Sequence, residues 1–319
     1  MSNSRWATVA STPISPALFW QTARLKADVA HLHFPHPPGE VANWLLRPAT
    51  ATVISYHSDV VRQAGLLRLY KPLMKRVLNR ADAIIYGSPP MKHSVYLRPH
   101  AAKLHLIPYG VPLDRFLKEP SDEEFDRVRA RYPIGSADRS KLLFVGRLRY
   151  YKGLNVLIDA LPQIDAQLIV VGIGPMMDEW QTLARARGVA DKVTWLGEVS
   201  DADLPALYHL SDLFVLPATH ASEAFGLVQV EAMASGVPTI CTEVGTGTSW
   251  VTQDGQTGYV VAPNDPAALA EKINRLLADP PLRQTLGAAG RARAQAEFAV
   301  ERLIGRVEQL YQTLISRSL

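Results

Sequence analysis

The chain has 319 residues, 47% of them hydrophobic and 20% charged, which is typical of a folded protein rather than a disordered one. Its single cysteine, Cys241, excludes a disulfide framework and any metal site with several cysteine ligands. No run approaches the ~20 apolar residues that span a bilayer, and the N-terminus lacks the pattern of a secretion signal. We therefore expect a cytoplasmic protein, and its length suits two domains.

Short apolar runs alternate with longer segments of helical periodicity, which predicts α/β domains whose parallel sheets are covered on both faces. In the first half, strands are predicted at residues 29–34, 52–57, 83–86 and 104–108. In the second half, they are predicted at residues 141–145, 168–171, 193–196, 213–216 and 239–241. Helices are predicted at residues 153–161, 176–187, 203–211 and 227–235, and residues 281–316 are expected to form consecutive helices.

A break between two domains is predicted near residues 110–140, where prolines and glycines flank an acidic helix around 122–131. The predicted segments are residues 1–120, residues 121–298 and a C-terminal helix over 299–319 that packs back toward the first domain. Residues 1–120 hold 15 Lys and Arg against 6 Asp and Glu, whereas residues 121–319 hold 19 against 24. This asymmetry indicates that one domain meets an anionic partner.

The segment SEAFGLVQVEAMASG, residues 222–236, follows a buried strand and is expected to open a helix near Phe225. A helix N-terminus presents free N–H groups and a partial positive charge, so it attracts anions. Glu223 precedes this helix and Glu231 lies eight positions later, so both carboxylates can line one side of a ligand site. The alternative is that Glu223 only stabilises the helix dipole and that Glu231 is an ordinary surface glutamate. The segment lies at the carboxyl end of a central strand, and open α/β sheets bind ligands there. This position favours the functional interpretation.

Two further segments carry candidate ligand-binding residues. In VGRLRYYKG, residues 145–153, Arg147 and Lys152 flank a turn that follows a strand, which suits a diphosphate clamp. The alternative is a pair of solvated surface cations. In VGIGPMMDE, residues 171–179, Gly172 and Gly174 allow close approach of a ligand or of backbone, although a lone G-x-G often marks only a tight turn.

Together these three segments resemble glycosyltransferase family four, a group of retaining transferases with the two-domain GT-B fold. The family's two glutamates, separated by seven residues, are matched by Glu223 and Glu231. Its G-R-L…K-G segment is matched by residues 146–153, and its glycine–proline loop by residues 172–175. The resemblance extends from about residue 28 to the C-terminus. It implies two Rossmann-like domains with a cleft between them, the first on the acceptor side and the second binding the nucleotide-sugar donor.

The resemblance also implies a role for each matched residue. Arg147 and Lys152 would neutralise the diphosphate, Glu223 would contact hydroxyl groups of the sugar, and Glu231 would contact those of the ribose. Other donor contacts would fall on Gly146, Gly172, Gly174, Ala224, Phe225, Gly226 and Leu227, with Glu198 and Val199 beside the nucleobase. Because two cations and a helix N-terminus would face the diphosphate, neither a metal nor another cofactor is expected.

His57 follows a buried strand, where a histidine is usually a satisfied core residue. In family members the ring or the backbone of a histidine at the end of this strand faces the transferred sugar, so His57 joins Glu223, Arg147 and Lys152 as a catalytic candidate. The segments YHSDVVRQ (56–63) and HLHFPHP (31–37) resemble the branch that builds lipopolysaccharide O-chains, often as mannosyltransferases. Resemblance to that branch is the sole basis for the expected substrates. The expected donor is GDP-mannose, with UDP-glucose as the second choice, and the expected acceptor is lipid-linked or a glycan.

The alternating histidines also suit a metal site, but no cysteine or acidic ligand lies in register.

Residues 60–81 form a basic amphipathic segment that contains six Lys and Arg and no acidic residue. Two interpretations remain open for it. It can lie on the anionic inner face of the membrane, or it can be a core helix with a basic outer face. Nucleic acid is disfavoured as the polyanionic partner because no recognised binding module is present.

The sequence departs from the family at its start. Family members open with a strand, a glycine-rich loop and a further strand–helix unit, whereas here about 28 residues precede the first clear strand. A shortened acceptor-side domain is therefore expected.

Other enzymes with related folds fit the sequence less well. A dinucleotide-dependent oxidoreductase would need G-x-G-x-x-G after an early strand and an acidic residue ~20 positions later, and neither is present. A phosphorylase needs a cofactor-bearing lysine, and a sugar-nucleotide epimerase lacks this glutamate pattern. A catalytically silent nucleotide-sugar-binding protein remains the alternative function.

Overall fold

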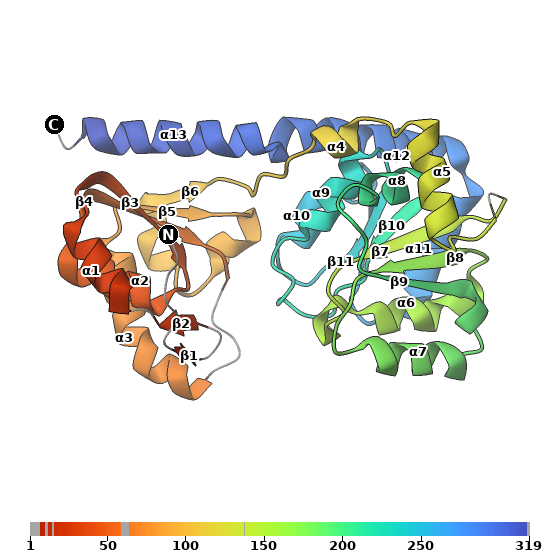
Figure 1. Cartoon of the computed structure of the whole chain (residues 1–319), viewed down its shortest axis with the longest axis horizontal. Coiled ribbons are helices and arrows are strands. Elements are labelled where there is room, and N and C mark those ends of the chain that lie inside the picture. Colours follow the sequence, from red (N-terminus) through yellow and green to blue (C-terminus); the bar gives the residue numbers. More distant parts are fainter. Residues whose placement is uncertain (1–6, 10–11, 15, 59–63, 137, 318–319) are drawn as a thin grey trace. The chain divides into compact units, whose positions relative to one another are not determined.

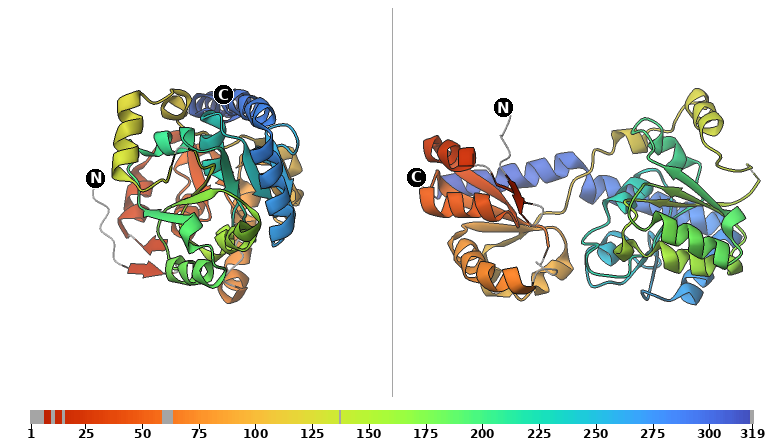
Figure 2. Two further views of the ribbon diagram at one scale, coloured as in Figure 1. Left: turned by 90° about the vertical axis from the view of Figure 1, so that its right-hand side faces the viewer. Right: turned by 60° about the horizontal axis from the view of Figure 1, so that its bottom comes forward.

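The computed structural model describes residues 7–9, 12–14, 16–58, 64–136 and 138–317, with residues 7–9, 12–14, 16 and 64–69 described as backbone only. The chain divides into two compact units: unit 1 is Met1–Pro108 with Leu303–Leu319, and unit 2 is Tyr109–Arg302. Each unit has a parallel sheet with helices on both faces (Figures 1 and 2). The predicted α/β class with two Rossmann-like domains is therefore confirmed.

Unit 2 contains a six-stranded parallel sheet in the order β12-β11-β10-β7-β8-β9. Its strands are β7 (Lys141–Val145), β8 (Gln167–Val171), β9 (Val193–Gly197), β10 (Leu213–Leu216), β11 (Thr239–Thr242) and β12 (Gly258–Val261). Its helices are α4 (Asp114–Leu117), α5 (Asp122–Arg131), α6 (Leu154–Ala160), α7 (Met177–Ala186), α8 (Leu204–His209), α9 (Leu227–Ala234), α10 (Thr248–Val251), α11 (Pro266–Ala278) and α12 (Pro280–Arg293). The five strands predicted in this half are confirmed, and β12 was not predicted.

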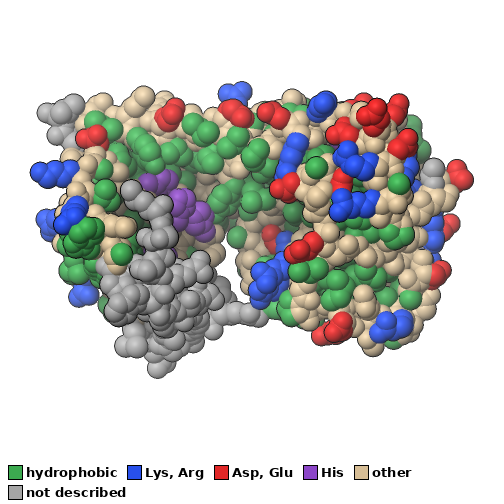
Figure 3. Space-filling view, viewed as in Figure 1, with side chains coloured by type: hydrophobic (Ala, Val, Ile, Leu, Met, Phe, Trp, Pro, Cys, Tyr) green, Lys and Arg blue, Asp and Glu red, His purple; other side chains and the backbone are tan. Residues whose placement is uncertain are grey.

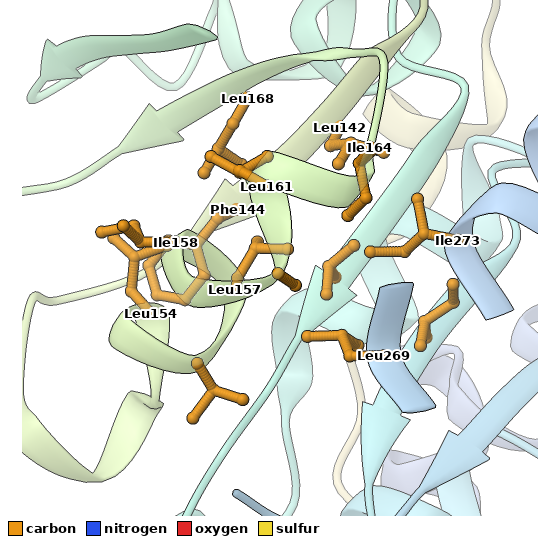
Figure 4. Packing of buried hydrophobic residues seen from close by; sticks show 14 of the residues in the cluster. Leu142, Phe144, Leu154, Leu157, Ile158, Leu161, Ile164, Leu168, Leu269 and Ile273 are labelled. Atoms are coloured by element: carbon orange, nitrogen blue, oxygen red, sulfur yellow. The ribbon is translucent and has the colours of Figure 1, made fainter. Parts of the chain in front are cut away.

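Two hydrophobic cores lie on opposite faces of the unit 2 sheet because side chains alternate along a strand. Leu142 and Phe144 of β7 point into the first core, where α6 and α11 pack against them (Figure 4). Leu143 and Val145 point into the second core, which includes buried residues of α8 and α9. The strands are predominantly apolar because both faces of the sheet are covered.

Unit 1 contains a four-stranded parallel sheet in the order β3-β4-β5-β6. Its strands are β3 (Ala27–Phe34), β4 (Ala49–Tyr56), β5 (Ala83–Tyr86) and β6 (Leu104–Leu106), and a separate antiparallel pair is formed by β1 (Ala7–Val9) and β2 (Thr12–Ile14). Its helices are α1 (Pro16–Arg24), α2 (Pro37–Leu46), α3 (Ala64–Arg80) and part of α13 (Val300–Ser316). Leu310 and Leu314 of α13 pack with Val53 and Ile85 on one face of the sheet. All four strands predicted in this half are present.

The boundary between the units lies at Pro108, earlier than the expected position at residue 120. The prolines and glycine near residue 110 mark a change of direction, but the apolar residues that follow belong to the second core of unit 2. Phe116 is fully buried there, and the Val111 N–H donates to the Phe298 carbonyl at 2.8 Å. Residues 109–120 are therefore part of unit 2.

Helix α3 covers most of the basic segment at residues 60–81. Its buried side chains, Met74, Val77 and Leu78, fill the core of unit 1, while Lys71, Lys75 and Arg76 are exposed. The described side chains thus form a core helix with a basic outer face. Residues 60–63 lie outside the described part of the chain. Among the described residues, no helix combines the length and apolar character needed to cross a membrane.

Asp203 links α8 to α5 in unit 2. Its buried carboxylate accepts hydrogen bonds from Arg127 at 3.0 Å, from Arg131 at 3.1 Å and from the Tyr132 hydroxyl at 3.1 Å. Burial opposes ionisation of this carboxyl, but hydrogen bonds from Ser200, Arg127 and Tyr132 outweigh that effect and lower its pKa. The carboxylate is therefore stabilised in the folded state.

We expect Asp203→Ala to lower the free energy of unfolding by about 1–3 kcal/mol, because buried donors lose their acceptor while the arginines stay partly hydrated. The folded pKa lies below the unfolded one, so the stabilisation is present above the unfolded pKa and is lost as pH falls through the folded pKa. Urea unfolding at several pH values should show the gap between wild type and variant closing in acid. Asp201→Ala, which removes an exposed carboxylate, is the control and should change stability little. A gap that widens in acid would contradict this account.

Candidate functional site

Four loops of unit 2 meet where β7, β8, β10 and β11 end. The sheet is parallel, so these strands share one carboxyl edge, the usual ligand-binding edge of open α/β sheets. β10 pairs with both β7 and β11, and β7 also pairs with β8. The candidate motifs at residues 145–153, 171–179 and 222–236 therefore begin at neighbouring strand ends.

Lys152 and Glu223 form an ion pair at this edge. Lys152 ends the short helix η3 (Tyr150–Lys152), and Glu223 lies in the loop between β10 and α9. Lys152 Nζ lies 2.7 Å from Glu223 Oε2, and only 11% and 10% of the two side chains are exposed. A lysine ammonium has three N–H groups, so it can keep this carboxylate and still donate to an anionic ligand.

The glycines of the β7 and β8 loops allow the two backbones to touch. Gly172 has φ +126°, and a Cβ atom there would lie 2.1 Å from the Gly146 carbonyl oxygen. A Cβ atom on Gly174 would lie 2.3 Å from the Leu148 carbonyl oxygen. Between these loops the Leu148 N–H donates to the Ile173 carbonyl at 2.9 Å. The close approach that the glycines predicted is thus one of backbone to backbone.

Lys152 and Glu223 are also positioned through the β10 loop. Gly153 has φ +69°, and a Cβ atom there would lie 1.9 Å from the Pro217 carbonyl oxygen. On the other side, the Thr246 hydroxyl donates to the Glu223 carbonyl at 2.6 Å, and the Gly247 N–H donates to the Ala224 carbonyl at 2.8 Å. Loops from three neighbouring strands therefore fix the ion pair.

Helix α9 begins at Leu227, with Gly226 as its N-cap, which agrees with the prediction of a helix that opens near Phe225. The Phe225 ring is 3% exposed and makes edge contacts with Tyr109, Trp250 and Phe298 in the second core. The side chain of Phe225 is therefore a core residue, so the predicted contact of Phe225 with the donor could come only from its backbone. Leu227 is 43% exposed, so the start of α9 opens to the surface of unit 2.

Glu231 lies within α9 and contacts α8. Its Oε2 accepts a hydrogen bond from the Tyr208 hydroxyl at 2.8 Å. Burial raises the pKa of Glu231, against the opposing effects of the Tyr208 hydrogen bond and the positive charge of Arg115. Its other carboxylate oxygen makes no hydrogen bond within the described part of the chain, which leaves it available to a ligand hydroxyl.

Gln229 is a site-supporting residue that sequence reasoning missed. It is fully buried, and its Oε1 accepts from the Thr252 hydroxyl at 2.8 Å. Its Nε2 donates to the Phe225 and Thr248 carbonyls at 3.4 and 3.5 Å. A polar residue among the apolar positions of LVQVEAMA was the available signal, because such a residue needs buried hydrogen-bond partners.

Three further residues of unit 2 that were predicted to bind the donor do not take part in the Lys152–Glu223 ion pair. Arg147 is exposed in the turn after β7, and its side chain makes no hydrogen bond or ion pair with any described residue. Glu198 is exposed after β9, while Val199 is half-buried against the second core. Arg147 is thus a solvated cation a few residues before Lys152 in the same loop.

His57 lies in unit 1, directly after β4. It lines a cavity of about 480 Å³ together with His31, His33, His36 and Glu40, and histidines cluster on one face of this unit in Figure 3. Its Nε2 lies 2.8 Å from His33 Nδ1, and burial lowers its pKa, helped by the nearby charge of His33. Across the described residues, no group of three or more His, Cys, Asp or Glu side chains is arranged to hold a metal ion.

Known proteins match both units. Residues 7–115 match the family described as Glycosyltransferase Family 4, and residues 129–293 match Glycosyl transferases group 1. A D-rhamnosyltransferase of Pseudomonas aeruginosa is 38% identical over 293 residues, which cover 91% of this chain and 75% of the relative. The O-antigen chain mannosyltransferase C of Escherichia coli is 34% identical over 316 residues, 98% of this chain and 83% of the relative.

A solved structure gives the same arrangement of elements. The Anabaena protein HepE, solved in complex with UDP, has a TM-score of 0.79 at 22% identity, over 95% of this chain and 82% of that chain. The two parallel-sheet units thus form a GT-B fold, and the molecule is a glycosyltransferase. The chain belongs to glycosyltransferase family 4.

We expect Gly172→Ala to destabilise unit 2 by about 2–4 kcal/mol, because a positive φ and an overlap with backbone act together. Thermal unfolding measures the loss. Gly188→Ala is the matched control: Gly188 also has a positive φ, of +68°, but a Cβ atom there would have no neighbour within 4 Å. The control should lose only about 1 kcal/mol. Equal losses in the two variants would show that contact between the β7 and β8 loops is unimportant.

Proposed function

We propose that this enzyme transfers a hexose, with retention of anomeric configuration, from a nucleotide-diphosphate sugar to a lipid-linked or glycan acceptor of a cell-surface polysaccharide. The buried Lys152–Glu223 pair is the observation that carries the proposal. It holds an ammonium and a carboxylate together at the ligand-binding edge of the sheet, one for the diphosphate and the other for sugar hydroxyls. The mannosyltransferase relative favours mannose as the transferred sugar, for which we propose GDP-mannose as donor, and the UDP bound by HepE keeps UDP-glucose as the second choice.

Charge on the leaving diphosphate is the quantity that the site must stabilise. Lys152 donates to it from a fixed position, and Arg147 closes on it from solvent with a bidentate guanidinium. The first N–H groups of α9 add a partial positive charge. Glu223 accepts hydrogen bonds from the sugar, the free oxygen of Glu231 accepts from the ribose, and the acceptor attacks on the face from which the diphosphate departs.

Two features of unit 1 complete the proposal. His57 borders a cavity large enough for a sugar, and its role toward the transferred hexose follows from the family resemblance. The exposed Lys71, Lys75 and Arg76 on α3 attract the anionic inner face of the cell membrane, where a lipid-linked acceptor is found. The enzyme then works in the cytoplasm as a peripheral membrane protein.

We expect one nucleotide diphosphate, GDP or UDP, to raise the melting temperature by a few degrees in the presence of EDTA. A ligand at 100 times its dissociation constant adds about 2.7 kcal/mol of stability, and side-chain cations supply the charge that a metal would otherwise provide. Thermal unfolding against GDP, UDP, ADP and their sugar conjugates measures the shift. The shift should disappear in Lys152→Met with Arg147→Ala.

Lys192→Met is the control, since Lys192 bonds to backbone carbonyls away from this edge. A shift that requires added Mg²⁺ would contradict metal independence. Nucleotide release is then followed with and without a lipid-linked acceptor. A protein that saturates with donor yet releases no nucleotide is a silent binding protein rather than a transferase.

We expect Arg147→Ala to reduce kcat/KM more than Glu231→Ala does. Arg147 meets charge that develops only as the diphosphate departs, whereas Glu231 holds the ribose equally in the ground state and the transition state. Steady-state kinetics with varied donor measure both variants. Arg147→Ala should lower kcat by about 10²- to 10³-fold, and Glu231→Ala should mainly raise the KM for donor. Equal losses of kcat/KM would overturn these two roles.

A further inference from the structure

Three histidine rings form a stacked row in unit 1. His31 and His33 project from the same face of β3, because they are two residues apart on a strand. The centroids of these two rings are 5.1 Å apart, with a 15° angle between the planes. The ring of His57, which follows the neighbouring strand β4, stacks on His33 at 5.1 Å and 3°. Since β3 and β4 pair in parallel, the row is set by the register of the two strands.

One end of the row is anchored by hydrogen bonds. His31 Nδ1 lies 2.5 Å from the Tyr311 hydroxyl of α13, and His31 Nε2 lies 2.8 Å from the hydroxyl of Ser55 on β4. Both nitrogens of this ring are therefore occupied, and its orientation is fixed. The other end is the bond of 2.8 Å between His33 Nδ1 and His57 Nε2. His33 thus lies between the hydrogen-bonded ring of His31 and the ring of His57.

The His33–His57 bond is linked to the tautomer of the His57 ring. Burial lowers the pKa of His31 to about 4 and also lowers that of His57, so both rings are neutral at neutral pH. A neutral imidazole has one nitrogen that donates and one that accepts. The nitrogen that His57 presents to His33 therefore determines whether its other nitrogen carries a proton.

We propose that His33 is a positioning residue that holds the ring of His57 in one orientation and one tautomer for the transfer reaction. This inference rests on the proposed function only for the role of His57. Glu40, the carboxyl group that lines the same cavity, has hydrogen-bond donors of its own. It accepts from the Tyr70 hydroxyl and, at 2.6 Å, from the backbone N–H of His36. His33 itself is exposed, so its replacement should leave the fold intact.

The test uses the full chain with ¹⁵N-labelled histidine rings and the variants His33→Phe and His33→Gln. Phenylalanine keeps the stacking and removes the hydrogen bond, whereas glutamine retains a side chain that can hydrogen-bond to His57. His93→Phe, which replaces another exposed histidine of unit 1, is the control. Signals of His57 are assigned by their loss in His57→Gln. We expect His57 to change from one tautomer to a mixture in His33→Phe, with partial recovery in His33→Gln.

Kinetics then connect positioning to turnover. His33→Phe should lower kcat by about 10- to 100-fold with little change in the KM for donor, and the melting temperature should stay near that of His93→Phe. Unchanged ring-nitrogen signals of His57 in His33→Phe would overturn the proposal whatever the activity. If the signals change as expected but His57→Gln retains full kcat, the positioning stands and the proposed role of His57 fails instead.

Discussion

The geometry of the proposed donor site depends on the ion pair between Lys152 and Glu223. The two residues are far apart in sequence and meet because β7 and β10 are neighbouring parallel strands. Removing either partner would leave the other charge buried without a counter-ion, and such a charge is strongly destabilising. The pair therefore connects two loops to each other and keeps an ammonium at the edge where the sheet binds ligands. If the donor binds as proposed, this one contact couples its binding to local stability.

Around the pair, backbone rather than side chains determines the shape of the site. Gly153, Gly172 and Gly174 each lie where a Cβ atom would come within 1.9–2.3 Å of a carbonyl oxygen in another loop. Larger residues would push the loops apart and separate Lys152 from Glu223. The buried amide of Gln229 also holds loops together, since it connects the start of α9 to the β11 loop. A rigid frame of this kind leaves exposed side chains, Arg147 above all, to adapt to the ligand.

The sequence allowed the strands to be predicted well because buried parallel strands are continuous apolar runs bounded by glycine and proline. All nine predicted strands are present. Contacts that depend on strand order or on distant segments could not be predicted. Phe225 was placed at the ligand site because it lies inside a motif, yet its burial depends on Tyr109, Trp250 and Phe298 from three other segments. The bond from His33 to His57 likewise requires the register of β3 and β4, which no local pattern encodes.

The distribution of charge shows why the donor site needs fixed cations. Unit 2 carries 19 Lys and Arg against 25 Asp and Glu, whereas unit 1 carries 15 against 5. The unit that is proposed to bind a diphosphate is thus acidic as a whole, and its net charge repels such a ligand at long range. Attraction must come from groups within a few ångströms, where Lys152, Arg147 and the start of α9 act in a partly desolvated site. Because Glu223 partly neutralises Lys152, the advantage of the buried pair is position rather than net charge. The net positive charge of unit 1 suits the anionic membrane surface that we propose as its partner.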